Sequence, residues 1–198
     1  MLIAFSGKTL MGKTTAAQYL RDEHGFTIVS FAAALKDKVR DDFGFTEEQV
    51  RGVKKDEVDP RYKVTPRAIL IAVGNLYRRF DPDFWVKKAL STITLHGKLV
   101  PGKYVIDDCR FKNEATHVSA VGGHVVRLSR PGVEPSDLSA AMDLSETDMD
   151  DYPFLPGMLL YSESIEIMHE RVDGVLTYLS SNATMYPCQT DVGGVHVI

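Results

Sequence analysis

The residues best suited to chemistry lie close to the N-terminus. Residues 7–14 read Gly-Lys-Thr-Leu-Met-Gly-Lys-Thr and match G-x-x-x-x-G-K-[ST] at every fixed position. Glycines at the fixed positions let the backbone curl so that successive N–H groups point at one anion. The lysine adds a mobile cation, and the hydroxyl that follows it can ligate Mg²⁺. The pattern predicts a phosphate-binding loop (P-loop) for a nucleoside triphosphate, contacted by Gly7, Lys8, Met11, Gly12, Lys13, Thr14 and Thr15.

A second polar group follows an apolar run in the middle of the chain. Residues 104–107 predict a strand, and Asp107, Asp108 and Arg110 lie at its end. In P-loop folds an acid at the end of a neighbouring strand can hold Mg²⁺ or its waters. We therefore expect Thr14 and Asp108 to be the metal ligands, although the sequence does not decide between Asp108 and Asp107. The alternative is that one of these acids caps the next helix or pairs with Arg110.

Arginines form the third candidate group. Phosphoryl transfer relies on cations that gather charge, and guanidinium forks suit the phosphate of an acceptor. Arg67 is well placed, because Thr65-Pro66 before it is a typical helix start with a Thr cap and Pro in the first turn. For each of these arginines the alternative is a solvated surface side chain. The full set is Arg67, Arg78, Arg79, Arg110, Arg127 and Arg130.

Strand-like runs alternate with helix-length segments along the chain. Strands are expected at residues 2–6, 26–31, 104–107, 124–129 and 158–161. Helices are expected at residues 13–24, 32–43, 65–79, 81–94, 113–121 and 163–180. Such alternation predicts βαβ units, and hence an α/β fold with a parallel sheet of about five strands flanked by helices.

Composition and charge exclude several classes of protein. The 198 residues are 44% hydrophobic with a net charge of −4, which is ordinary for a globular chain and argues against a nucleic-acid binder. The two cysteines form no CxxC pair and no HExxH motif occurs, so neither a disulfide framework nor a zinc site is expected. No apolar run approaches the roughly 20 residues of a membrane span. We expect a cytoplasmic protein (in the host cytoplasm if viral) without nucleic-acid or membrane partners; homodimer formation is left open.

In order and spacing, these motifs resemble those of the bacteriophage deoxynucleoside monophosphate kinases and, more distantly, the animal-type phosphomevalonate kinases. The resemblance runs from Leu2 to about Leu179. Besides the P-loop, it is carried by residues 30–32, 35–36, 65–67, 74, 83–86, 108–111, 113–115, 122–123, 127, 130–132 and 145–146. It implies a P-loop kinase that converts ATP and a deoxynucleoside monophosphate (dNMP) into ADP and the diphosphate, supplying DNA precursors.

The resemblance also implies a layout and roles for single residues. Residues 1–181 would form one kinase domain with an acceptor-binding helical segment at about 44–97 and a lid-like acidic loop at about 131–156, followed by a tail at 182–198. The catalytic residues would be Lys13, Arg110 between donor and acceptor, and Arg130 as a lid arginine. The acceptor would be bound by Lys36, Arg67, Asp108 and Arg127. This sequence departs from the family at Ala33-Ala34, where an acid is common, and at residues 161–164, where an Asn-containing turn is usual.

The type of acceptor can also be argued from chemistry. A monophosphate has a second pKa of about 6, so its attacking oxygen is ionised at neutral pH and needs no general base. An alcohol acceptor usually benefits from a carboxylate base. The many arginines and the absence of an isolated acid after the P-loop therefore favour a phosphate acceptor. Another phosphorylated small molecule, such as phosphomevalonate or dephospho-coenzyme A, remains an alternative, and so does an ATP-binding switch or ATPase that drives a partner.

Overall fold

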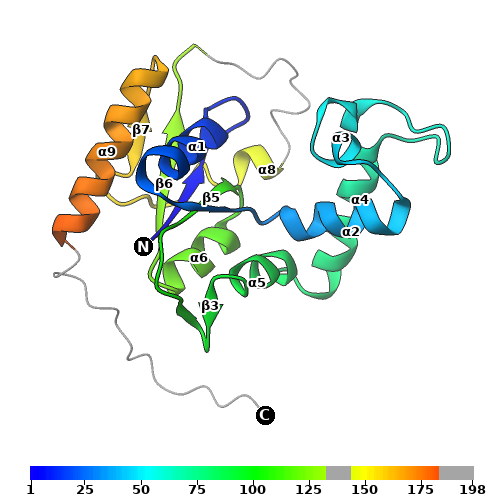
Figure 1. Ribbon diagram of the computed structural model, residues 1–198, viewed down its shortest axis with the longest axis horizontal. Helices are drawn as coiled ribbons and strands as arrows, with labels where there is room; N and C mark the ends of the chain where they lie inside the picture. The colour runs from blue at the N-terminus through cyan, green and yellow to red at the C-terminus, as the bar shows by residue number, and fades with distance from the viewer. Residues whose placement is uncertain (133–143, 183–198) are drawn as a thin grey trace.

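A five-stranded parallel sheet forms the centre of the computed structural model, which describes residues 1–132 and 144–182 (Figure 1). The strands lie in the order β2-β5-β1-β6-β7, and every neighbouring pair is parallel. Their bounds are β1 Leu2–Ser6, β2 Thr27–Val29, β5 Tyr104–Cys109, β6 His124–Ser129 and β7 Leu159–Tyr161. The predicted α/β fold with about five parallel strands is confirmed.

Helices cover both faces of this sheet. On one face lie α1 (Lys13–His24) and α9 (Ile165–Asn182), and on the other lie α5 (Phe84–Leu90) and α6 (Lys112–Ala120). Strand β1 divides its side chains between the two layers: Ile3 and Phe5 pack with the α1 and α9 side, and Leu2 and Ala4 pack with the α5 and α6 side. A strand buried on both faces is apolar throughout, which is why residues 2–5 show no alternation with polar residues.

The strand order places the P-loop at a point where ligands bind in such sheets. After β1 the chain passes through α1 to β2 on one side of the sheet, whereas β6 and β7 extend it on the other side. In open α/β sheets the crevice beyond the carboxyl ends of the strands at this switch point is the usual binding site. The loop after β1 and the acidic end of β5 both lie there, because β1 and β5 are neighbours.

A group of helices stands beside the sheet and carries its own apolar cluster (Figure 1). It comprises α2 (Ala33–Phe43), α3 (Glu47–Val50), the short 3₁₀ helix η1 (Val53–Asp56) and α4 (Pro66–Phe80). The predicted start of α4 is confirmed, since the Thr65 hydroxyl accepts a hydrogen bond of 3.1 Å from the Ala68 N–H and Pro66 occupies the first turn. The residues of the cluster are Leu35, Val39, Phe45, Val50, Ile69 and Trp85.

Two local predictions differ from the structure. The helix expected over 81–94 ends at Leu90, and residues 94–99 form a hairpin of β3 (Thr94–Leu95) and β4 (Lys98–Leu99). Its two-residue turn has positive φ at both His96 (52°) and Gly97 (74°), the conformation that a tight hairpin requires. The expected acidic loop at 131–156 contains a short helix, α8 (Leu144–Thr147), while its residues 133–143 and the tail at 183–198 lie outside the described residues. Within the described ranges, no helix is long and apolar enough to cross a membrane.

Candidate functional site

The P-loop closes tightly around the amino group of Lys13. Gly7 has a φ of 141°, and a Cβ on it would lie 2.5 Å from the carbonyl oxygen of Leu128, so only glycine fits beside β6. The Lys13 ammonium donates to the carbonyl oxygens of Gly7 and Lys8, at 2.5 and 2.7 Å. Helix α1 begins at Lys13 itself, so its N-terminal N–H groups face the same space as the ammonium.

Lys13 is a cation with little access to water. The residue is only 8% exposed. Burial, and next the charge of Arg110, lower its pKa to about 8, although Glu146, Asp107 and Asp108 act in the opposite direction. A desolvated ammonium held at a helix N-terminus is stabilised by a bound anion, which is the property required of a phosphate site.

The side-chain oxygens of Thr14 and Asp107 are the pair best arranged to bind a metal ion. The Thr14 hydroxyl donates to Oδ2 of Asp107 over 3.2 Å. Burial and the neighbouring Asp108 raise the pKa of Asp107, so a cation at this position would be favourable for its charged form. One hydroxyl and one carboxylate fit Mg²⁺, which binds few protein ligands and keeps waters and substrate phosphates. In the described part of the chain no group of three or more His, Cys, Asp or Glu residues could hold a metal by itself.

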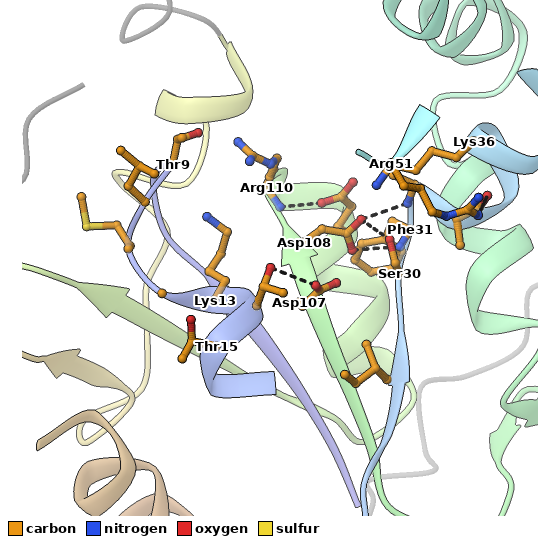
Figure 2. Close-up of a pocket in the computed structure, with 18 of the residues that line it drawn as sticks. Thr9, Lys13, Thr15, Ser30, Phe31, Lys36, Arg51, Asp107, Asp108 and Arg110 are labelled. Carbon is orange, nitrogen blue, oxygen red and sulfur yellow. Dashed lines mark hydrogen bonds between the residues drawn. The ribbon is translucent and has the colours of Figure 1, made fainter. Parts of the chain in front are cut away.

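Asp108 is occupied by the segment between β2 and α2. Its carboxylate accepts hydrogen bonds from the Ser30 hydroxyl (2.6 Å) and from the N–H groups of Phe31 (2.9 Å) and Ala32 (3.0 Å) (Figure 2). Asp108 therefore fastens this segment to the end of β5. Since Asp107 faces Thr14 and Asp108 faces away from it, the geometry favours Asp107 as the metal ligand, a choice that the sequence left open.

One cavity of about 760 Å³ runs from the P-loop to the helical group beside the sheet. P-loop residues 9–15 line one end, and the opposite end carries a set of cationic side chains. Figure 2 shows Lys13 and Arg110 on the P-loop side and Lys36 and Arg51 across the cavity, with Asp108 between the two sides. The cationic residues that line the cavity besides Lys13 are Lys36, Arg51, Lys55, Arg78, Arg110 and Arg130.

The structure brings together most of the residues predicted for the site. Among the described residues, those that line the cavity include Met11, Gly12, Lys13, Thr14, Thr15, Lys36, Asp108, Arg110 and Arg130. Four predicted residues are not part of this lining. Gly7 lies one layer below it, where its carbonyl accepts from Lys13, and the Lys8 ammonium lies 3.4 Å from Asp150.

Arg67 and Arg127 lie outside the cavity lining and contact acids of the protein itself. Arg67, near the start of α4, pairs with Asp56 of η1 on an exposed surface. Arg127 donates to the carbonyl oxygen of Met149 over 2.8 Å and pairs with Asp150. Arg127 thus fastens the segment after α8, and neither arginine lines the cavity.

Several cavity residues were missed by the sequence reasoning. Arg51 and Lys55 lie within the charge-dense stretch at 46–63, whose ordinary solvated appearance hides which of its cations face inward. Glu114 is buried, and desolvation raises its pKa to about 8 even though Oε2 accepts from the N–H groups of Arg110 (2.6 Å) and Phe111 (3.0 Å). Glu146 was part of a motif without an assigned role, and it contacts both the P-loop and Arg110.

Comparison with known proteins places the chain in a family. No protein-family model matches it. A protein of Acanthamoeba polyphaga mimivirus described as a "putative deoxynucleotide monophosphate kinase" is 33% identical over 150 residues, which cover 69% of this chain and 78% of that protein. An uncharacterized protein, ORF76, of Ictalurid herpesvirus 1 (strain Auburn) is 28% identical over 152 residues, 76% of this chain and 57% of that protein.

Two solved structures are similar at lower identity. Shikimate kinase from Aquifex aeolicus has a TM-score of 0.47 at 15% identity and covers 93% of this chain and 99% of its own. Dephospho-CoA kinase from Campylobacter jejuni has a TM-score of 0.49 at 13% identity, covering 90% and 96%. Both TM-scores lie below 0.5, so these likenesses say nothing about what this chain binds. At 33% identity over more than two thirds of both chains, however, this protein belongs to the viral family represented by the mimivirus deoxynucleotide monophosphate kinase-like protein.

Proposed function

We propose that this protein is a kinase that transfers the γ-phosphate of ATP to the phosphate of a deoxynucleoside monophosphate, giving ADP and the diphosphate. The observation that carries the proposal is the single cavity that joins a P-loop at one end to a group of cations at the other, with Arg110 lining it as well. A transfer between two phosphates requires both ends to hold negative charge. The name of the mimivirus relative supports the same substrate class.

The donor end is formed by the P-loop. Lys13 and the N-terminus of α1 would hold the β- and γ-phosphates of ATP, because both present positive charge to one point. Thr14 and Asp107 would hold Mg²⁺, which neutralises charge on the phosphates when bound. The absence of the N-K-x-D element of guanine-specific switches from the sequence favours ATP over GTP.

The acceptor end is formed by α2, the 46–63 stretch and α4. Lys36, Arg51, Lys55 and Arg78 line it, and Arg78 also lies over the ring of Phe111 at 5.4 Å from its centroid. These cations would hold the acceptor phosphate, and the apolar side chains beside them offer a surface for a base or sugar. The apolar and aromatic residues that line this end are Phe31, Leu35, Trp85 and Phe111.

The carboxylates that line the cavity accept hydrogen bonds from the protein itself, which fits a reaction that needs no general base. Asp108 accepts three hydrogen bonds, Asp107 accepts from Thr14, and Glu114 accepts from two backbone N–H groups. A monophosphate oxygen is ionised at neutral pH and attacks without losing a proton. The chain's own contribution is then to align the two phosphates and to neutralise the charge between them, with Arg110 beside Lys13 and Arg130 at the exposed rim.

A coupled assay of ADP release across a panel of acceptors tests the proposal. The panel comprises the deoxynucleoside and ribonucleoside monophosphates, phosphomevalonate and dephospho-coenzyme A, with a sample that lacks any acceptor. We expect ADP release that depends on one or more deoxynucleoside monophosphates. Turnover with phosphomevalonate or dephospho-coenzyme A alone would move the protein to another kinase class, and acceptor-independent hydrolysis alone would identify an ATPase.

A further inference from the structure

Glu146 joins two parts of the site that are far apart in sequence. Its Oε2 accepts a hydrogen bond of 2.6 Å from the N–H of Thr9 in the P-loop, and its Oε1 accepts one of 2.7 Å from the Thr9 hydroxyl. The same Oε1 pairs with Nη1 of Arg110. The Glu146 side chain is only 8% exposed, whereas its partner Thr9 lies on the exposed side of these contacts. Arg110 is thereby drawn to the mouth of the P-loop.

The charges around this carboxylate explain why such a link is needed. Lys13 and Arg110 are close enough that the charge of Arg110 lowers the pKa of Lys13, which means that the two cations repel each other. Burial alone would raise the pKa of Glu146, but the hydrogen bonds from Thr9 and the charge of Arg110 hold it below its usual range. Glu146 is therefore ionised at neutral pH and offsets the repulsion that would otherwise push Arg110 away. In Figure 2 the side chain of Lys13 points into the space between Thr9 and Arg110.

The segment that follows Glu146 is attached to the core of the protein. Met149, three residues further on, is buried among the apolar side chains of the α5 and α6 layer. Asp148 accepts from the N–H of Lys112 over 2.7 Å, and Arg127 donates to the carbonyl oxygen of Met149. Because the backbone that carries Glu146 is fixed in this way, its carboxylate restricts the positions that the bound guanidinium can take. An ion pair between groups that are already fixed loses little side-chain entropy when it forms.

We propose that Glu146 is a positioning residue that holds Arg110 against Thr9, in place to contact the transferring phosphoryl group. This inference rests on the proposed kinase function for its effect on turnover, and on the structure alone for its effect on Arg110. Glu146 would act through Arg110 and would not itself touch either substrate. The contrary arrangement is a carboxylate that merely occupies the phosphate site in the empty protein and competes with ATP.

A double-mutant cycle with Glu146→Ala and Arg110→Ala tests the dependence on Arg110. A misplaced catalytic group can cost about 100-fold in rate, so Glu146→Ala is expected to lower kcat by about 10- to 100-fold while the KM for ATP changes by less than about threefold. In the Arg110→Ala background the same substitution should have almost no further effect, because the residue it positions is already gone. Glu146→Gln, which keeps an oxygen for Thr9 but loses the charge, should lower kcat by an intermediate amount. Glu170→Gln on the exposed side of α9 removes the same charge elsewhere and serves as the matched control.

A second measurement reads Arg110 directly and needs no turnover. The Nε–Hε signal of Arg110 can be assigned in an NMR spectrum of the nucleotide-free protein by its loss in Arg110→Lys. We expect this signal to report a side chain with restricted fast motion in the wild type and in Glu170→Gln, and a mobile side chain in Glu146→Ala. Tm values of the variants, measured in parallel, identify any general loss of fold.

The outcomes separate this inference from the function on which it rests. Wild-type protein without acceptor-dependent turnover would count against the proposed function, whereas the NMR comparison would still decide the inference. An Arg110 signal that is unchanged in Glu146→Ala overturns the positioning role. So do additive losses of kcat in the double mutant, or tighter ATP binding with unchanged kcat, which would identify Glu146 as a competitor of the phosphate.

Discussion

The hydroxyl of Thr14 donates to Oδ2 of Asp107 over 3.2 Å, which joins the start of α1 to the end of β5. The start of α1 lies beside the end of β5 because β1, which leads into the P-loop and α1, pairs directly with β5. The adjacent acid, Asp108, points to the other side of β5 and holds the β2–α2 segment through three hydrogen bonds. Two acids that are neighbours in sequence therefore have different partners, and their substitution should have different consequences.

Substitution of Asp107 should impair the use of Mg²⁺. Asp107→Asn keeps an oxygen for Thr14 but removes the negative charge that would face the metal. We expect the Mg²⁺ concentration for half-maximal activity to rise, and kcat at fixed Mg²⁺ to fall, each by about 10- to 100-fold. The affinity for ATP without Mg²⁺ should be retained, because Lys13 is unchanged. A titration of activity against Mg²⁺ measures the effect, and an unaltered titration curve would remove Asp107 from the metal site.

Substitution of Asp108 should act mainly on stability. Asp108→Ala removes a carboxylate that accepts from one hydroxyl and two backbone N–H groups. Hydrogen bonds to charged groups contribute about 1.5–3 kcal/mol each, not additively, so we expect a loss of about 2–3 kcal/mol in the free energy of unfolding. Urea denaturation of Asp108→Ala, with Asp107→Asn as the comparison, measures this free energy of unfolding. If Asp108→Ala kept full stability and Asp107→Asn lost it, the roles assigned to the two acids would be reversed.

The sequence predicted the α/β framework and the turn between β1 and α1, for physical reasons. The P-loop pattern predicts its own conformation, because the path of the backbone requires Gly7 and Gly12 and a bound phosphate requires Lys13. The neighbouring strands are recognisable because they are apolar on both faces. The end of the cavity beside the helical group was harder to predict, because a cation in a charge-dense stretch looks the same whether it faces water or a cavity. Thus Arg51, which lines the cavity, was missed and Arg67, which does not line it, was chosen; both arginines also pair with acids of the protein. The roles of Asp107 and Asp108 depend on which side of β5 each side chain faces. Alternation along a strand predicts that the two face opposite sides, but which side is which is known only once the elements that pack beside β5 are known.

Nucleotide affinity should fall as the pH rises through the pKa of Lys13. Burial and the charge of Arg110 lower that pKa to about 8, so in the empty protein the ammonium loses its proton above this pH. If the phosphates bind the protonated form, the apparent affinity for ADP without Mg²⁺ decreases by up to about tenfold per pH unit above pH 8. Calorimetry or a fluorescent ADP between pH 7 and 10 measures it.

Lys13→Arg provides the control for this pH dependence. A guanidinium stays protonated throughout the range, so the variant's affinity, even if weaker overall, should be nearly independent of pH between 7 and 10. Parallel curves for the wild type and Lys13→Arg would show that another group titrates, and would contradict the assignment to Lys13.

Glu114 should make the protein less stable as the pH rises. Its pKa is raised to about 8 in the folded protein, above the ordinary value of 4.5, and desolvation is the main cause. Between these values the folded state binds more protons than the unfolded state, so the free energy of unfolding decreases with increasing pH. Glu114→Gln cannot ionise and should lose this dependence. The stability of the variant relative to the wild type should thus increase by up to about 1.4 kcal/mol per pH unit from about pH 5 to 8.

Urea denaturation of both proteins across this pH range measures the difference. The comparison cancels the groups that titrate alike in both, and Glu170→Gln, in an exposed position on α9, controls for loss of a glutamate. A constant difference between Glu114→Gln and wild type from pH 5 to 8 would mean that Glu114 is ionised in the folded protein over the whole range.

Acceptor binding should depend on Lys36 and hardly on Arg67. Lys36 of α2 lines the cavity on the side opposite Lys13 (Figure 2). Arg67 of α4 pairs with Asp56 and is not part of the cavity lining. A charged hydrogen bond to a phosphate contributes about 1.5–3 kcal/mol, so Lys36→Ala should raise the KM for the deoxynucleoside monophosphate by about 10- to 100-fold and leave the KM for ATP within about threefold. Arg67→Ala removes a cation from the same helical group and should leave both KM values within that threefold range. If Arg67→Ala instead raised the acceptor KM and Lys36→Ala did not, the acceptor phosphate would have to lie beyond this cavity, near the start of α4, and the pairing of Arg67 with Asp56 would have to open to admit it.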